Sequence, residues 1–277
     1  MPTTRRYVAG VLKLLAKAYG RPQWRCWGRA LDVLVETILS QNTSNANSSA
    51  GYRQLRRKFR SWGRVADAPV EQVEECIRIS GLSRIKAPRI QRILRQIREA
   101  PPSIACDSAH APDRKCSPQV ATSKHSRSGK ALTNPAVIRE EVVHGITPAK
   151  GRADRISLEF LRDWSVGDAN RYLLAFDGVG PKTAACVLLF SFNMPIFPVD
   201  THIHRIAIRM GWVQPGVTAE QTQELLTPML APEDRYAAHI LLIAHGRQTC
   251  RAPAPGCEWC NLQTLCPYGA TRLSQGR

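Results

Sequence analysis

The stretch from Leu173 to Phe190, LLAFDGVGPKTAACVLLF, constrains the fold of this chain most strongly. It is an apolar helical pattern that breaks at DGVGPK and then resumes. Glycine adopts backbone conformations that other residues resist, and proline suits the first turn of a new helix. The stretch therefore predicts a helix, a tight hairpin around Gly178 and Gly180, and a second helix that begins at Pro181.

The start of that second helix is a candidate anion site. Backbone N–H groups in the first turn of a helix have no intrahelical partner and attract negative charge, so a phosphate would fit there. An ordinary packing joint between two helices is the alternative. Further along, Asp200 in FPVDTHIHR is expected to cap a helix over residues 201–210. A functional role would need this carboxylate to face the hairpin near Lys182.

Helical periodicity recurs along most of the chain. ALDVLVETILS, at residues 30–40, has one apolar stripe and predicts an amphipathic helix. Similar patterns predict helices over residues 70–79, 90–97, 158–164, 184–192 and 237–244. Alternating strand patterns are scarce, so the predicted fold class is all-α.

Residues 101 to about 155 have a different composition. They are rich in Pro, Ser, Ala and Lys and contain few large apolar side chains. Such a segment cannot bury enough surface to offset the conformational entropy that ordering would remove. We expect a flexible basic insertion with a short helix over residues 137–143, in which Cys106 and Cys116 are free thiols and not a second metal site.

Charge and hydropathy narrow the classes of partner. The 277 residues carry a net charge of +17, from 39 Lys and Arg against 22 Asp and Glu, which favours nucleic acid. No apolar run approaches the roughly 20 residues of a membrane span, and the N-terminus lacks the apolar stretch of a signal peptide. We expect a cytoplasmic protein, nucleoid-associated if bacterial, that is a monomer and binds no membrane.

Four of the nine cysteines lie close together near the end of the sequence, at Cys250, Cys257, Cys260 and Cys266. A disulfide framework does not suit a cytosolic chain, so this density of thiols predicts metal binding. The C-x6-C-x2-C-x5-C spacing by itself leaves zinc and an iron–sulfur cluster open.

Several motifs together resemble one family. GVGPKTA and VDTHIHR resemble the hairpin and downstream aspartate of the helix–hairpin–helix (HhH-GPD) DNA glycosylases, in particular the endonuclease III branch. The cysteine-rich tail resembles that branch's [4Fe–4S] loop, ILSQNTS its helix end with a DNA-inserting glutamine, and GLSRIKAPRI another recurrent helix start. The resemblance covers about residues 28–100 and 156–268, and the basic insertion departs from it.

The resemblance implies two helical lobes with a DNA-binding cleft between them. Residues 28–198, with the insertion, would form a six-helix barrel lobe that contains the hairpin. Residues 1–27 and 199–277 would form a second lobe that holds a [4Fe–4S] cluster through the four cysteines. The implied partner is double-stranded DNA with a damaged base or an abasic site, whose target nucleotide is flipped into the cleft.

The resemblance also implies roles for single residues. Lys182 would be the nucleophile that attacks C1′, expels the base and forms a Schiff base, after which elimination cuts the strand on the 3′ side. Asp200 would accept a proton or stabilise positive charge on the sugar, and Gln41 would fill the gap left by the base. The hairpin residues that would bind DNA are Gly178, Val179, Gly180 and Thr183.

Glu36 leaves the type of reaction open. It matches the catalytic glutamate of the family's adenine-removing mismatch glycosylases, which generally lack the lysine, and it would line the base pocket or face solvent. The expected activity is that of a bifunctional glycosylase and abasic-site lyase acting on oxidised pyrimidines. A monofunctional mismatch glycosylase that uses Glu36 and Asp200, and a non-catalytic DNA-binding scaffold, are the alternatives.

Overall fold

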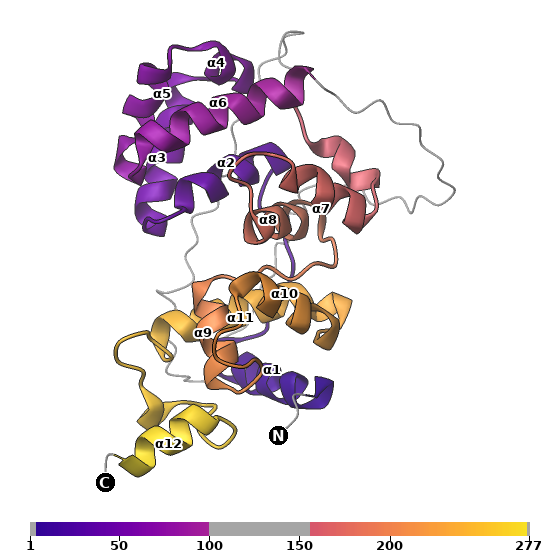
Figure 1. Cartoon of the computed structure of the whole chain (residues 1–277), viewed down its shortest axis with the longest axis vertical. Coiled ribbons are helices and arrows are strands. Elements are labelled where there is room, and N and C mark those ends of the chain that lie inside the picture. The colour runs from indigo at the N-terminus through magenta and orange to yellow at the C-terminus, as the bar shows by residue number, and fades with distance from the viewer. Residues whose placement is uncertain (1–3, 100–155, 276–277) are drawn as a thin grey trace, which may run out of the picture. The chain divides into compact units, whose positions relative to one another are not determined.

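The structure is a computed structural model that describes residues 4–99 and 156–275. Every regular element in these two ranges is helical, which confirms the predicted all-α class (Figure 1). The α-helices are α1 (Arg5–Tyr19), α2 (Ala30–Ser40), α3 (Asn45–Lys58), α4 (Trp62–Asp67), α5 (Val70–Ile77), α6 (Ser83–Glu99), α7 (Val166–Leu174), α8 (Pro181–Phe192), α9 (Thr201–Arg209), α10 (Ala219–Leu226), α11 (Arg235–Gln248) and α12 (Pro267–Gln275). The 3-10 helices are η1 (Arg78–Ser80), η3 (Glu159–Asp163), η4 (Thr227–Met229), η5 (Pro232–Asp234) and η6 (Cys257–Trp259). The basic insertion, with its predicted helix and Cys106 and Cys116, lies outside the described residues.

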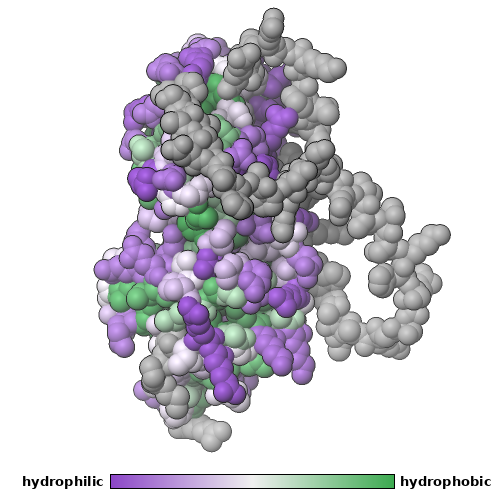
Figure 2. Space-filling view, turned by 90° about the vertical axis from the view of Figure 1, so that its right-hand side faces the viewer, coloured by the Kyte–Doolittle hydropathy of each residue, from purple (hydrophilic) through white to green (hydrophobic). Residues whose placement is uncertain are grey.

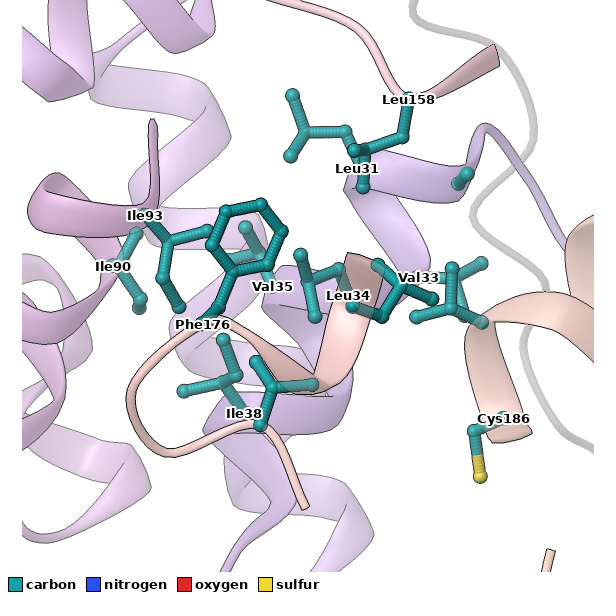
Figure 3. Packing of buried hydrophobic residues seen from close by; sticks show 14 of the residues in the cluster. Leu31, Val33, Leu34, Val35, Ile38, Ile90, Ile93, Leu158, Phe176 and Cys186 are labelled. Atoms are coloured by element: carbon teal, nitrogen blue, oxygen red, sulfur yellow. The ribbon is translucent and has the colours of Figure 1, made fainter. Parts of the chain in front are cut away.

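Helix α2 has the predicted bounds and lies at the centre of the packing around the hairpin. Its side chains at Val33, Leu34 and Ile38 are buried. Burial of each large aliphatic side chain contributes about 1.5–3 kcal/mol to stability. Figure 3 shows the ring of Phe176, from the turn after α7, between Ile93 of α6 and α2. The core of α2 therefore fixes the hairpin against α6.

The buried apolar residues of the described chain form two clusters. The larger is built mainly by α2–α8, and the smaller by α1, α9–α11 and Leu262. Helix α1 packs on α11 although the two are far apart in sequence: Tyr19 Oη lies 3.2 Å from His245 Nδ1. The division into lobes at residues 198 and 199 stays a prediction.

Two segments differ from the helices that periodicity predicts. Residues 158–164 contain the 3-10 helix η3, because Ser165 already caps α7 and leaves no room for an α-helix of several turns. The helix predicted over residues 70–79 ends as an α-helix at Ile77 and continues as η1, which terminates at Gly81 with φ +66°. Neither deviation changes the fold class.

The described surface is mixed in character. On the face drawn in Figure 2, hydrophobic residues form small groups among hydrophilic ones. No helix in residues 4–99 or 156–275 is long and apolar enough to cross a membrane. One group of exposed aliphatic residues belongs to a single short segment, where η1 leads into α6: Ile79, Leu82 and Ile85 are 44%, 49% and 53% exposed.

Candidate active site

The hairpin between α7 and α8 has the predicted form. Gly178 has φ +78°, a conformation that favours glycine, and a Cβ atom there would lie 2.2 Å from Arg89 Nε. Gly180 has φ −86° and is exposed, with open space where a Cβ atom would be. Only Gly178 therefore requires the conformational freedom of glycine.

Helix α8 begins without a side-chain cap. Pro181 occupies its first turn, and Gly180 precedes it. Val179 and Thr183 are each 4% exposed, so their side chains pack in the core, and their predicted DNA contacts would have to come from backbone groups. The N–H of Val179 donates to the carbonyl of Phe176 at 3.0 Å. What the hairpin offers to an anion is the backbone at Gly180 and the first-turn amides of α8.

Asp200 caps α9, as predicted, and lies in the same neighbourhood as Lys182. Its Oδ1 accepts a hydrogen bond from the Ile203 N–H at 2.9 Å. Lys182 and Asp200 both act electrostatically on the same two buried residues, Cys186 and His239. No ion pair within 4.0 Å joins Lys182 to Asp200 among the described salt bridges. The lysine amine is therefore not held by that carboxylate.

Two buried residues near these charges, Cys186 and His239, could not be recognised from the sequence. Cys186 follows Lys182 by one turn of α8, and its sulfur points away from the α2 side chains labelled in Figure 3. Burial raises the pKa of the Cys186 thiol, which keeps it protonated. His239 Nδ1 lies 2.9 Å from the Pro198 carbonyl, to which it donates. Burial lowers the pKa of His239 to about 4, so the ring is neutral near pH 7.

Gln41 directly follows α2 and faces the hairpin. Its Nε2 donates to the carbonyl oxygen of Gly178 at 3.3 Å, and its Oε1 lies 3.5 Å from Arg89 Nη1. The next residue, Asn42, has φ +55° and is exposed. The predicted inserting residue is therefore at the edge of the hairpin, on a sharp turn.

Two residues near Gln41 were missed by sequence reasoning. Leu82 is an exposed leucine with φ +51°, a conformation that side chains such as leucine rarely adopt. Lys86 is 1% exposed, and its Nζ donates to the carbonyl oxygens of Leu39 and Ser80. A large apolar residue next to a glycine in GLSRIK was the available signal for Leu82, whereas nothing in the sequence distinguishes Lys86 from a solvated lysine.

Glu36 is a residue of α2, and its side chain reaches α3. Its Oε1 accepts a hydrogen bond from Ser49 Oγ at 3.2 Å. Burial raises the pKa of this carboxyl, and the hydrogen bond from Ser49 opposes the shift. The charged groups that act on it are Asp32 and Arg53, from α2 and α3, and Lys182 is not one of them.

The four clustered cysteines line one cavity of about 20 Å³, together with residues of α9 and α11. Backbone N–H groups of Leu262 and Gly269 donate to two of the sulfurs, at 3.4 and 3.3 Å. Arg209 Nη1 donates to Cys250 Sγ at 3.2 Å. Donors of this kind stabilise thiolates and suit iron–sulfur ligation.

The cysteines surround a volume and do not converge on a point. In residues 4–99 and 156–275 no three His, Cys, Asp or Glu side chains are close enough to hold a single metal ion. Burial raises the pKa of the Cys260 and Cys266 thiols, so ligation of a metal there would release protons. The four free thiols at this cavity are a donor set that suits either a zinc ion or an iron–sulfur cluster.

The chain is similar in sequence to DNA repair proteins. It is 29% identical over 217 residues to the putative DNA glycosylase At3g47830 of Arabidopsis thaliana, which covers 78% of this chain and 56% of the relative. Endonuclease III of Thermotoga maritima is 29% identical over 237 residues, covering 85% of this chain and 82% of the relative. The DNA glycosylase/AP lyase ROS1 of Arabidopsis thaliana is 34% identical over 139 residues, covering 44% of this chain and 10% of the relative. The chain thus spans about half of At3g47830 but most of the Thermotoga protein.

The fold matches solved structures of endonuclease III bound to DNA. A non-covalent endonuclease III–DNA complex aligns with a TM-score of 0.68 at 22% identity, over 98% of this chain and 99% of that one. A trapped endonuclease III–DNA covalent intermediate aligns with the same score and coverage. The model of the HhH-GPD superfamily base excision DNA repair proteins matches residues 35–232, from within α2 to the start of η5. The chain, with its hairpin and its helix-capping aspartate, belongs to that superfamily.

Proposed function

We propose that this protein is a bifunctional DNA glycosylase and abasic-site lyase that acts on a damaged base, an oxidised pyrimidine, in double-stranded DNA. The observation that carries this is the position of Lys182 in the first turn of α8, a helix without a side-chain cap. Asp200 lies close enough that both charges act electrostatically on the buried Cys186 and His239. The family membership and the relative ROS1, described as a glycosylase and AP lyase, support it. We also propose that the protein works as a cytoplasmic monomer.

The hairpin would hold the DNA backbone. The positive end of the α8 dipole and its unbonded first-turn amides favour a phosphate next to Gly180, where no side chain stands in the way. A phosphate bound there would place the sugar of a neighbouring nucleotide close to Lys182. The turn at Gly178 positions these amides, and in the free protein Gln41 Nε2 donates to the Gly178 carbonyl oxygen.

Lys182 would supply the nucleophile. Its unprotonated amine attacks C1′ of the flipped nucleotide, the C1′–N bond breaks, and the base leaves with a proton. The C1′–O4′ bond then breaks, O4′ takes up a proton, and the resulting protonated Schiff base between C1′ and Nζ acidifies the C2′ proton. Removal of that proton expels the 3′ phosphate and cuts the strand. Asp200 is placed to accept a proton or to stabilise positive charge on the sugar during these steps.

Gln41 and Leu82 would fill the space that the flipped nucleotide leaves. Flipping a base out of the duplex costs a few kcal/mol of lost stacking and pairing. Side chains inserted into the gap recover part of this free energy. Gln41 offers an amide that can bond to an orphaned base. Leu82 offers exposed apolar surface on a sharp turn, a shape suited to entering a base step.

The cavity lined by the four cysteines would hold a [4Fe–4S] cluster. Cys250, Cys257, Cys260 and Cys266 would be its ligands, and Arg209 would neutralise part of their negative charge. When bound, the cluster would supply structural cross-linking of the segment after α11 and not chemistry on the base. A yellow-brown protein with visible absorption would support this assignment, and a colourless one containing zinc would contradict it.

The test of the activity is borohydride trapping on DNA with one abasic site. Wild type is expected to give a covalent adduct, and Lys182→Gln to give none while it still binds the DNA, because the amine that forms the imine is gone. Lys58→Gln is the control: Lys58 is an exposed lysine paired with Glu75 in another part of the chain, and its loss should leave trapping unchanged.

Two other outcomes would replace this proposal. Base release without any adduct in wild type would indicate a monofunctional glycosylase, and Glu36, whose carboxyl has a raised pKa, would be the acid or base to change next. Tight binding with neither base release nor adduct would indicate a DNA-binding scaffold.

A further inference from the structure

Lys86 is a charged residue in an unusual place. It is 1% exposed and one of the largest side chains that the described structure buries completely. Burial lowers the pKa of its amine, since a charge in a poorly solvated site is disfavoured. Such a group is retained only where hydrogen bonds offset the loss of water. The partners of the Lys86 ammonium group therefore indicate what this residue does.

Both of its hydrogen bonds lead to turns that carry the candidate inserting residues. Nζ donates to the Leu39 carbonyl at 2.7 Å, two residues before Gln41. It also donates to the Ser80 carbonyl at 2.8 Å, two residues before Leu82. These carbonyls lie at the C-terminal ends of α2 and η1, where a cation is favoured. One ammonium group thus joins the ends of two helices.

The backbone N–H of Lys86 and the side chain of Arg89 add further contacts to the same two turns. The Lys86 N–H donates to the Leu82 carbonyl at 2.9 Å, which ties the left-handed Leu82 to the first turn of α6. Arg89, one turn further along α6, lies against Gly178 and 3.5 Å from Gln41 Oε1. Helix α6 therefore holds the main chain before Gln41 through Lys86 and its side chain through Arg89.

We propose that Lys86 is a positioning residue that fixes the Gln41 turn and the Leu82 turn relative to each other, so that both side chains enter the duplex as one unit. This rests on the proposed function, because it assumes that the protein flips a nucleotide. Lys86 touches neither DNA nor the reacting atoms. Its loss should therefore impair extrusion of a stacked base and spare the chemistry at Lys182.

The experiment compares Lys86→Met with a matched control on the same helix. Gln91 is also buried, and its Nε2 donates to the carbonyls of Val65 and Ala68 at 2.8 and 2.7 Å, away from the inserting turns. Gln91→Leu removes two comparable hydrogen bonds. Each variant is measured by single-turnover excision of a paired damaged base, by excision of the same base when unpaired, and by borohydride trapping on an abasic site. Thermal unfolding is recorded for each.

The split between substrates decides the outcome. Lys86→Met should lower the excision rate of the paired base by about tenfold or more, because the protein must unstack that base. It should lower the excision rate of the unpaired base and the trapping rate on the abasic site by less than about threefold. Gln91→Leu should change all three by the same factor. An equal loss on all three substrates in Lys86→Met would overturn the proposal. Wild type that neither excises nor traps would instead refute the proposed function.

A second measurement does not depend on folding of the Lys86 variant. Gln41→Ala and Leu82→Ala change residues outside the buried core and can be combined in a double-mutant cycle on the paired substrate. If the two side chains act as a unit, the double variant should be no slower than the slower single variant. Effects that multiply would show that the two turns act independently, and would overturn the proposal.

Discussion

At the scale of single residues, His239 links the stability of the fold to pH. It is fully buried, its Nδ1–H is bonded to the carbonyl of Pro198, and burial lowers its pKa to about 4. In the unfolded chain the ring would titrate near its ordinary pKa of about 6.5. The unfolded state therefore binds a proton first as the pH falls below 6.5, and the folded state follows only near pH 4.

We expect His239→Asn to flatten the acid limb of the stability profile. Asparagine can keep a donor near Pro198 but does not titrate. Between pH 7 and pH 4, wild type should lose roughly 2–3 kcal/mol more unfolding free energy than the variant, because protonation of the unfolded histidine is no longer available to drive unfolding. Urea denaturation at several pH values measures this. Parallel profiles for the two proteins would show that another group controls the acid limb.

At the scale of elements, the hairpin depends on one glycine more than on the other. Gly178→Ala places a Cβ atom at a residue with φ +78°, which costs about 1–2 kcal/mol in backbone strain, and pushes on the Arg89 side chain. We expect lower stability and weaker DNA binding, because Arg89 would leave Gln41. Gly180 has φ −86° and open space where a Cβ atom would lie, so the Gly180→Ala variant should be as stable as wild type. Chemical denaturation of both variants checks this, and equal destabilisation would contradict it.

The same elements show what the sequence could and could not predict. Apolar periodicity predicted α2, and the Gly–Pro pattern predicted the start of α8, because both depend on short-range preferences. The Asp200 cap followed from a local motif as well. Lys86 could not be predicted, because its burial depends on where the ends of α2 and η1 meet in space. The 3-10 form of η3 was missed for a similar reason: its length is set by the start of α7.

At the scale of the whole molecule, the basic insertion should govern how binding responds to salt. Residues 106–150 include Arg114, Lys115, Lys124, Arg127 and Lys130. Each phosphate contact that such residues make steepens the plot of log affinity against log salt by about 0.9. Deletion of residues 106–150 should therefore flatten this slope equally on damaged and undamaged DNA. Trapping at low salt is the control and should be unchanged; an unaltered slope would exclude the insertion from DNA binding.

The packing of α1 also has a consequence for the order in which the chain folds during synthesis. Val8, Val11 and Leu15 are buried in a cluster whose other members run from Phe197 to Leu262. Most of the α2–α8 cluster can assemble on the ribosome before those partners have been translated. Helix α1 is synthesised before these partners, so its apolar face stays exposed to solvent until they have been translated.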